Sequence, residues 1–144
     1  AEIQRLDNTF NAEDFLVGAH VAFEMVLDGY SNHDRKILEN LLSPEVLVNF
    51  LRAIDEREEA GHVMEDTLVS IDKSDIVEAY IESEMAQVTV KFVSEQINVV
   101  RDSEGQIASG NPNEVINVVD LWTFARDIRS TNPNWALVAT HSLD

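Results

Sequence analysis

The chain has 144 residues, with 27 acidic against 10 basic side chains, no cysteine and 44% hydrophobic residues. This length suits one domain, and the normal apolar fraction shows that the acidity is not the signature of a disordered chain. A net charge of −17 makes nucleic acid a poor partner and argues against this segment alone holding an anionic bilayer, because both depend on basic side chains. Without cysteine there is no disulfide, thiolate zinc site or cysteine nucleophile, and we expect no cofactor.

The start of the chain suggests a piece of a longer protein. It begins at Ala1 rather than at a methionine, so we expect a processed or shortened product whose signal or anchor, if any, lies upstream. Residues 1–10 are mixed and polar and are predicted to be a lead-in. Residues 11–144 are predicted to form a single domain.

Three helices are predicted in the first half. Asn11 is the expected N-cap of a helix over residues 11–30. A short second helix covers residues 34–42. A serine cap and a proline in the first turn start a third helix at Ser43–Pro44, and Gly61 is its expected end.

The first helix is apolar around more than half of its circumference, so it is expected to contact two layers. Its second apolar side consists of Val17, Val21 and Met25. Two interpretations stay open for these three side chains: they are buried by packing within the chain, or they form a dimer or partner surface.

After the third helix the apolar period changes from helical to alternating. Four strands separated by short turns that suit antiparallel hairpins are predicted, over residues 66–81, 86–101, 114–130 and 135–142. Such long strands make a strongly curved or twisted sheet. Helices followed by a meander of strands predict an α+β fold, in which N-terminal helices pack on a curved four-stranded antiparallel sheet. This order resembles the cone of nuclear-transport-factor-two-like proteins, which often hold an apolar pocket between helix and sheet.

The third strand places charges on its apolar face. Alternate residues from Ile116 onward point to one side, and the aromatic members Trp122 and Phe124 mark that side as the core. Asp120 and Arg126 share it, about 20 Å apart, so each needs its own partner. The predicted role is structural, holding the sheet to the helices; a pocket base at Asp120 and a recognition role are the alternatives.

The four histidines, His20, His33, His62 and His141, do not have the spacing of metal ligands, and no metal site is expected. An acid–base pair of Asp120 with a histidine remains the enzymatic alternative. Nothing in the spacing selects which histidine would serve.

Several segments together resemble the Tim44-like domain family, which includes a mitochondrial import translocase subunit, proteobacterial proteins and a mitochondrial large-ribosomal-subunit relative. The most specific segment is Val119–Arg126, with the sequence VDLWTFAR. The resemblance spans roughly Asn11 to His141. The other segments, in order, are Phe15-Leu16-x-Gly18-Ala19 with Phe23, Leu41–Val46, Val88–Glu95 and Asn134–Thr140.

The resemblance implies a non-enzymatic domain, an accessory or scaffold in protein translocation or in the assembly of an inner-membrane complex. Family members act at the inner membrane, on the matrix side or at the equivalent cytoplasmic face in bacteria. We expect the C-terminal domain of a bacterial protein that presents an apolar groove to a preprotein segment, another protein, or an acyl chain or lipid. The expected lining is Phe15, Ala19, Phe23, Phe92, Trp122 and Phe124.

The acidity departs from the mitochondrial members, which reach the membrane partly through basic amphipathic segments ahead of the domain. Residues 1–10 hold Arg5 against Glu2 and Asp7. We therefore expect the membrane to be reached through an absent N-terminal anchor rather than through this domain. Two further hypotheses are a cone-fold isomerase or dehydratase that uses Asp120 with a histidine, and a dimerisation module built on Val17, Val21 and Met25.

Overall fold

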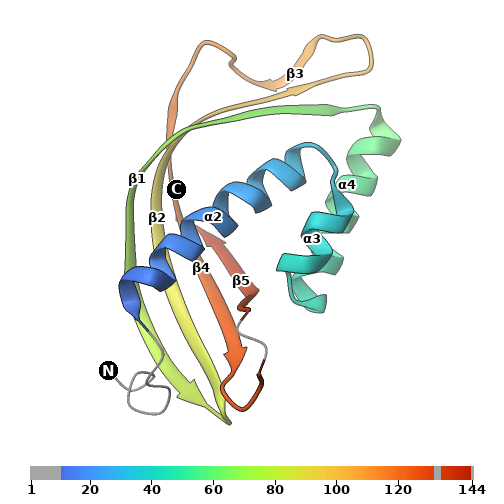
Figure 1. Ribbon diagram of the computed structural model, residues 1–144. Helices are drawn as coiled ribbons and strands as arrows, with labels where there is room; N and C mark the ends of the chain where they lie inside the picture. The colour runs from blue at the N-terminus through green and yellow to red at the C-terminus, as the bar shows by residue number, and fades with distance from the viewer. Residues whose placement is uncertain (1–10, 132–133, 144) are drawn as a thin grey trace.

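The computed structural model describes residues 11–131 and 134–143, in which helices come first and strands follow (Figure 1). The predicted lead-in at residues 1–10 lies outside the described residues. The helices are α2 (Ala12–Ser31), α3 (Arg35–Leu41) and α4 (Pro44–Ala60). The strands are β1 (Val63–Glu82), β2 (Met85–Arg101), β3 (Ile107–Gly110), β4 (Ile116–Asp127) and β5 (Ala136–Ser142).

The predicted helix ends are confirmed by their capping geometry. The Asn11 side chain accepts hydrogen bonds from the backbone N–H groups of Glu13 and Asp14, at 2.9 and 3.1 Å. The Ser43 side chain caps α4 ahead of its first-turn proline. Gly61 ends the same helix in the left-handed region, with φ 70°, a conformation that a side chain would strain.

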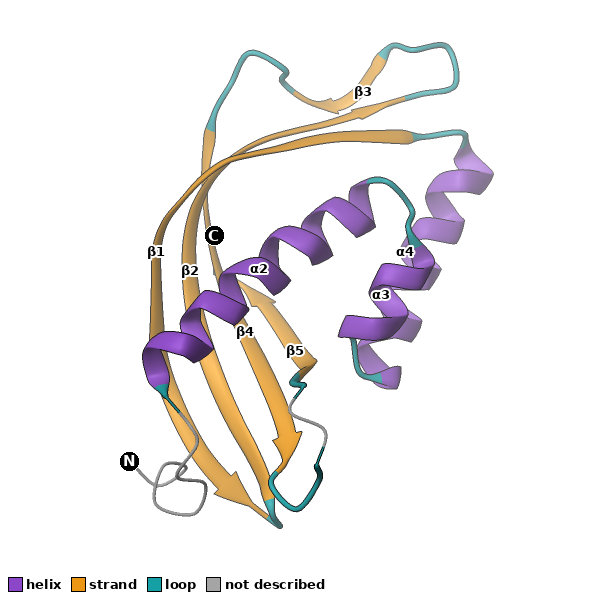
Figure 2. Cartoon of the chain, in the orientation of Figure 1, coloured by secondary structure: helices purple, strands orange, loops and turns teal. Residues whose placement is uncertain are grey.

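The sheet is antiparallel, with strand order β1-β2-β4-β5, and the expected α+β class with a curved sheet is confirmed. β1 and β2 arch over α2 (Figure 2). Three register shifts interrupt β1 against β2, between Leu68 and Ser70, Ile71 and Lys73, and Ile76 and Glu78. Such bulges bend and twist a strand, so they explain how a strand of 20 residues follows the arch.

The predicted number of strands is corrected from four to five. The segment expected to be only a turn contains β3, which pairs with the end of β2. Asp102 folds the chain back, because its side chain accepts hydrogen bonds from the N–H groups of Glu104 and Gln106 at 2.9 and 3.0 Å. All four residues of β3 are exposed, so no burial pattern in the sequence could reveal it.

The core lies between α2 and the concave face of the sheet. Phe23 of α2 stacks on Phe92 of β2 with a centroid distance of 4.3 Å, and it meets Trp122 of β4 at 4.6 Å. Along β2 the concave positions Ala86, Val88, Val90 and Phe92 are buried. Tyr30 at the end of α2 contacts Phe50 of α4 at 5.0 Å, which holds the smaller helices beside the cone.

Two glycines, Gly105 and Gly110, provide a matched test of the hairpin that β2 and β3 form. Gly110 has φ +85°, and a Cβ there would overlap the backbone carbonyl of Asn98. Gly105 has φ +81°, but a Cβ there would meet nothing within 4 Å. We expect Gly105→Ala to lower the free energy of unfolding by about 1–2 kcal/mol, the strain of a left-handed residue. Gly110→Ala should lower the free energy of unfolding by at least about 1 kcal/mol more than Gly105→Ala, because its Cβ must also push away the Asn98 carbonyl. Urea denaturation measures both, and equal losses would contradict the close approach of β3 to β2.

Candidate functional site

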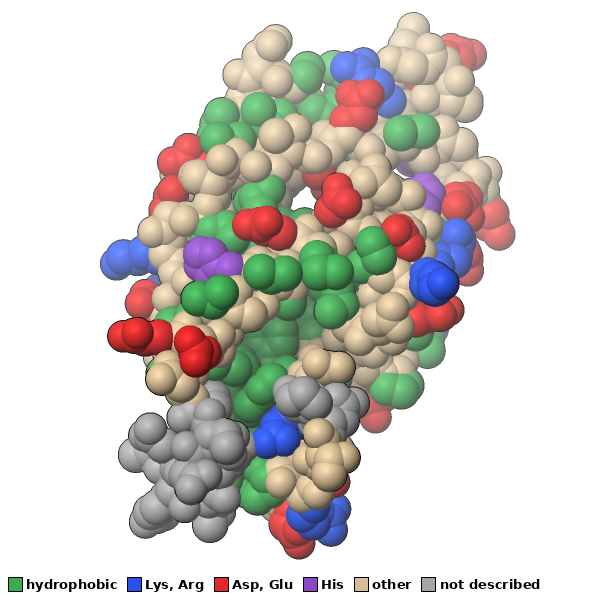
Figure 3. All heavy atoms as spheres, in the orientation of Figure 1, with side chains coloured by type: hydrophobic (Ala, Val, Ile, Leu, Met, Phe, Trp, Pro, Cys, Tyr) green, Lys and Arg blue, Asp and Glu red, His purple; other side chains and the backbone are tan. Residues whose placement is uncertain are grey.

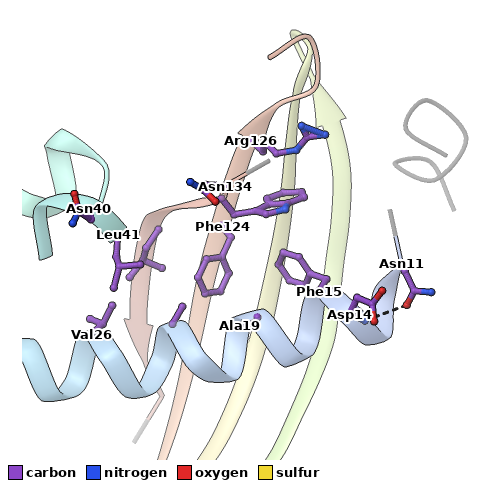
Figure 4. A pocket seen from close by; sticks show the side chains of 14 residues that line it. Asn11, Asp14, Phe15, Ala19, Val26, Asn40, Leu41, Phe124, Arg126 and Asn134 are labelled. Carbon is purple, nitrogen blue, oxygen red and sulfur yellow. Dashed lines mark hydrogen bonds between the residues drawn. The ribbon is translucent and has the colours of Figure 1, made fainter. Parts of the chain in front are cut away.

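A groove of about 570 Å³ lies between α2, the end of α3 and the adjoining ends of β4 and β5 (Figure 4). We call it the α2 groove. Figure 4 shows Phe15 and Phe124 facing each other, with Arg126 and Asn134 at one end and Asn40 and Leu41 at the other. Its apolar lining consists of Phe15, Ala19, Ala22, Val26, Leu41, Phe124, Trp135 and Leu137.

Aromatic rings build one end of the α2 groove. The ring of Phe15 meets the edges of Trp135 and Phe124 at centroid distances of 4.9 and 5.8 Å. The guanidinium of Arg126 lies 5.9 Å from the centre of the Trp135 ring, within the range of a cation–π interaction. On the α2 side the lining residues Gly18, Ala19 and Ala22 are small, so room is left in front of the rings.

The rim of the α2 groove is polar. Asn11, Asp14, Asn40, Arg126 and Asn134 contribute to its lining. Side-chain amides both donate and accept hydrogen bonds. The groove therefore combines an apolar floor with a polar rim.

The six residues predicted to line a groove fall into three places. Phe15, Ala19 and Phe124 line the α2 groove. Trp122 lines a separate cavity of about 350 Å³ beside α4. Phe23 and Phe92 are fully buried and form the stacked pair of the core.

Asp120 and Arg126 lie at opposite ends of the concave side of β4. Arg126 belongs to the α2 groove, whereas Asp120 lines the cavity beside α4 together with Trp122. Asp120 is opposite Ser142 of β5, and His141 is opposite Leu121. Both Asp120 and His141 line the cavity beside α4, although the alternation of side chains along a strand directs the two to opposite faces of the sheet.

Two other histidines have partners of their own. His20 Nε2 lies 2.5 Å from Ser74 Oγ, and His33 Nδ1 lies 3.2 Å from Glu58 Oε2. Neither His20 nor His33 lines the cavity that contains Asp120, so neither supports the enzymatic alternative. Within residues 11–131 and 134–143, no three His, Asp or Glu side chains are grouped so as to hold a metal ion. In the same ranges no helix is both long and apolar enough to span a membrane.

A third cavity, of about 520 Å³, lies between α2 and β1. We call it the acidic opening, because Glu24, Asp28 and Asp66 line it together with Gln96. Asp66 on β1 is directly opposite Asn98 on β2. The Oδ1 atoms of both side chains are buried without a hydrogen-bond partner among the described residues. Burial raises the pKa of Asp66 above its usual value, against an opposing hydrogen bond from the backbone of Val99 and the charge of Arg57.

Sequence reasoning missed these polar residues and part of the groove wall. The concave positions of β2 are apolar up to Phe92 and then become polar at Ser94, Gln96 and Asn98. This change from apolar to polar side chains could have indicated a polar cavity at that end of the strand. For Trp135 and Leu41 no local signal existed, because the tertiary fold alone brings them to the same groove.

The fold and the groove together define a cone-shaped α+β domain with an open groove beside its first helix. The sequence model of the Tim44-like domain family matches residues 1–142, so the chain belongs to this family. The fold is also that of the intermembrane space region of the chloroplast protein ARC6. The two structures have a TM-score of 0.63 with 15% sequence identity, over 93% of this chain and 97% of that one.

Curated relatives are import proteins. The chain is 19% identical over 97% of its length to the probable mitochondrial import inner membrane translocase subunit tin-44 of Caenorhabditis elegans, covering 34% of that protein. It is 22% identical over 92% of its length to the mitochondrial import inner membrane translocase subunit TIM44 of Homo sapiens, covering 29% of it. It is 24% identical over 85% of its length to the mitochondrial import inner membrane translocase subunit TIM44-1 of Arabidopsis thaliana, covering 26% of that protein. The chain thus spans about a third or less of the length of these relatives.

Trp122 tests the distinction between core and groove. Its side chain is 4% exposed, so Trp122→Ala should lower the free energy of unfolding by roughly 3–5 kcal/mol. Trp135→Ala removes the same side chain from a half-buried position in the groove wall and should cost less. Chemical denaturation of both variants makes the comparison. A Trp122→Ala protein of unchanged stability would show that Trp122 lines an open site.

Asp66 should make stability depend on pH in an unusual direction. Burial raises its folded-state pKa above the usual value of an aspartate. Its contribution to folding stability is therefore favourable below about pH 4 and is lost as the pH rises through the folded-state pKa. Asp66→Asn removes this loss and supplies an N–H donor opposite Asn98. The variant should therefore be more stable than the wild type at pH 7, and the difference should shrink toward pH 4.

The control is Asp75→Asn, an exposed change on the same strand with the same effect on net charge. Thermal unfolding between pH 4 and pH 8 gives both differences. Equal stabilisation by the two variants would mean that general charge repulsion, and not the burial of Asp66, is responsible.

Proposed function

We propose that this domain is a non-enzymatic accessory element in protein translocation at the inner membrane, and that the α2 groove holds an apolar segment of a polypeptide in transit. Membership of the Tim44-like family and the names of the relatives support the translocation role. The observation that supports the binding role is the α2 groove itself, where aromatic rings lie open beside small helical residues.

The shape and rim of the groove favour a peptide over an acyl chain. An acyl chain offers no hydrogen bonds beyond its headgroup, and it is best held by an apolar lining. The α2 groove instead carries the amides of Asn11, Asn40 and Asn134 and the charges of Asp14 and Arg126. A peptide leaves its backbone N–H and C=O groups in need of partners, and a rim of this kind supplies them.

The location in the cell follows from the same proposal. The domain would act on the cytoplasmic face of a bacterial inner membrane, the equivalent of the mitochondrial matrix side. An anchor upstream of Ala1 would hold it there, because a surface with a net charge of −17 is repelled by anionic lipid. The acidic body then faces solvent or a basic protein segment.

Gly18 allows the groove to be filled without disturbing the core. It lines the α2 groove, and a Cβ at this position would meet nothing within 4 Å. Gly18→Leu should preserve or raise stability, since glycine within a helix costs about 0.5–1 kcal/mol relative to alanine. The leucine should occupy the groove and weaken peptide binding at least about tenfold, because excluding one apolar side chain forfeits about 1.5–3 kcal/mol.

The measurement is fluorescence anisotropy with a labelled 15-residue peptide in which leucines alternate with serines, compared with an all-serine peptide. Val48→Leu is the control variant, because it places leucine at an exposed site of α4 outside the groove. Unchanged affinity in Gly18→Leu would overturn the groove assignment. The groove would be assigned to acyl chains if labelled palmitate bound the wild type but not Gly18→Leu, while the peptide bound both proteins equally.

A further inference from the structure

The charged side chains on the solvent face of α2 are all acidic, and the other exposed side chains there are apolar. The helix contains Glu13, Asp14, Glu24 and Asp28, and it has neither lysine nor arginine in its 20 residues. All four acidic side chains are exposed. A surface helix usually mixes both signs of charge on its polar face, so this helix has an unbalanced negative face.

An apolar ridge runs along the same face. Val17, Val21 and Met25 follow one another at intervals of four residues and therefore form one stripe, and they are 66%, 51% and 39% exposed. We call them the α2 ridge. Figure 3 shows a row of hydrophobic side chains along α2 bordered by acidic ones. Packing within the described chain does not cover the ridge, and aligned apolar side chains of this kind mark interaction surfaces.

The acidic opening continues this face at the C-terminal end of the ridge. Met25 belongs to both, and Glu24 and Asp28 flank the entrance. Figure 3 shows an opening bordered by acidic side chains beside the row. Inside, Gln96 is 6% exposed and donates its amide nitrogen to Ser94 at 2.9 Å, which leaves its carbonyl oxygen as an acceptor. Asp66, which also lines the opening, has an Oδ1 atom without a hydrogen-bond partner among the described residues, so acceptors at the opening remain unpaired.

We propose that the α2 ridge and the acidic opening form a docking face for a basic amphipathic helix of a protein partner. Its apolar side chains would pack along Val17, Val21 and Met25, and its lysines or arginines would pair with Glu24 and Asp28 at the opening. Ridges of residues spaced by four interdigitate between helices. The stretch from Val17 to Asp28 is about 17 Å long, which accommodates about three turns of a partner helix.

Charge decides between this occupant and the others. A second copy of the chain would bring the same patch against itself in a symmetric contact, with Glu24 and Asp28 facing like charges. An anionic bilayer would meet the same repulsion. A basic helix satisfies the apolar ridge and the acidic border together. The docking face is separate from the α2 groove, so this inference stands independently of the proposed function.

The test uses a labelled 18-residue helical peptide with leucines on one face and arginines on the other. Its controls are a scrambled peptide of the same composition and a version with glutamate in place of arginine. Glu24→Gln combined with Asp28→Asn removes two charges and keeps the shape of the surface. We expect this double variant to bind the peptide about fivefold more weakly, since two exposed ion pairs contribute about 1 kcal/mol together. Val21→Ser should also weaken binding, and raised salt should weaken it further.

The matched control is Glu56→Gln with Glu59→Gln, two exposed carboxylates on α4 whose removal changes the net charge equally. This control should retain the wild-type affinity within about twofold, because it leaves only screened long-range effects. Equal weakening by the two double variants would overturn the docking face in favour of general attraction, as would equal binding of the scrambled peptide. If Trp135→Ala weakened binding of the peptide and the ridge variants did not, the peptide would lie in the α2 groove. That result would overturn the docking face and leave the proposed function standing.

Two further measurements address the other occupants. Sedimentation velocity of the wild type and Val21→Ser, compared at high protein concentration, detects self-association through the ridge. Flotation with vesicles containing phosphatidylglycerol detects lipid binding. A dimer that Val21→Ser dissociates, or vesicle binding that it removes, would overturn the assignment to a basic helix, and a monomer that does not float supports it.

Discussion

The packing of α2 across the concave face of the sheet is the interaction on which the rest of the structure depends. Phe23 lies between Phe92 and Trp122 at centroid distances of 4.3 and 4.6 Å, so one helical side chain joins two strands. A domain of this size has one core, and the burial of apolar area there is its main source of stability. Every surface feature is positioned relative to this contact.

The curvature of the sheet determines what α2 leaves uncovered. A straight helix cannot follow a curved sheet along its whole length, so the two separate on either side of the central aromatic contact. On one side the α2 groove opens toward Trp135 and Arg126, where β4 and β5 end. On the other side β1 arches away through its three bulges, and the acidic opening results. One helix therefore borders two cavities of different chemistry.

Charge distinguishes the two sides of the helix. The α2 groove has an apolar floor and a rim of amides with one arginine and one aspartate, whereas the opposite face carries several carboxylates around an apolar ridge. Exposed carboxylates at this density raise solubility and repel anionic surfaces. The same carboxylates favour basic protein segments as partners. The excess of acidic residues therefore excludes anionic partners and favours basic ones.

The sequence by itself determined the three helices with their caps at Asn11, Ser43 and Gly61, the four long strands, the α+β class and the Tim44-like family. These features follow from local capping chemistry and from the spacing of apolar residues, both of which are visible in the linear sequence. The tertiary structure alone decided that β3 exists, that Phe15 and Phe124 share a groove with Trp135 while Phe23 and Phe92 do not, and that Asp66 lies opposite Asn98. Each of those outcomes depends on the register and curvature of long strands. A bulge shifts the register by one residue and turns a side chain to the other face, so no local pattern could specify them.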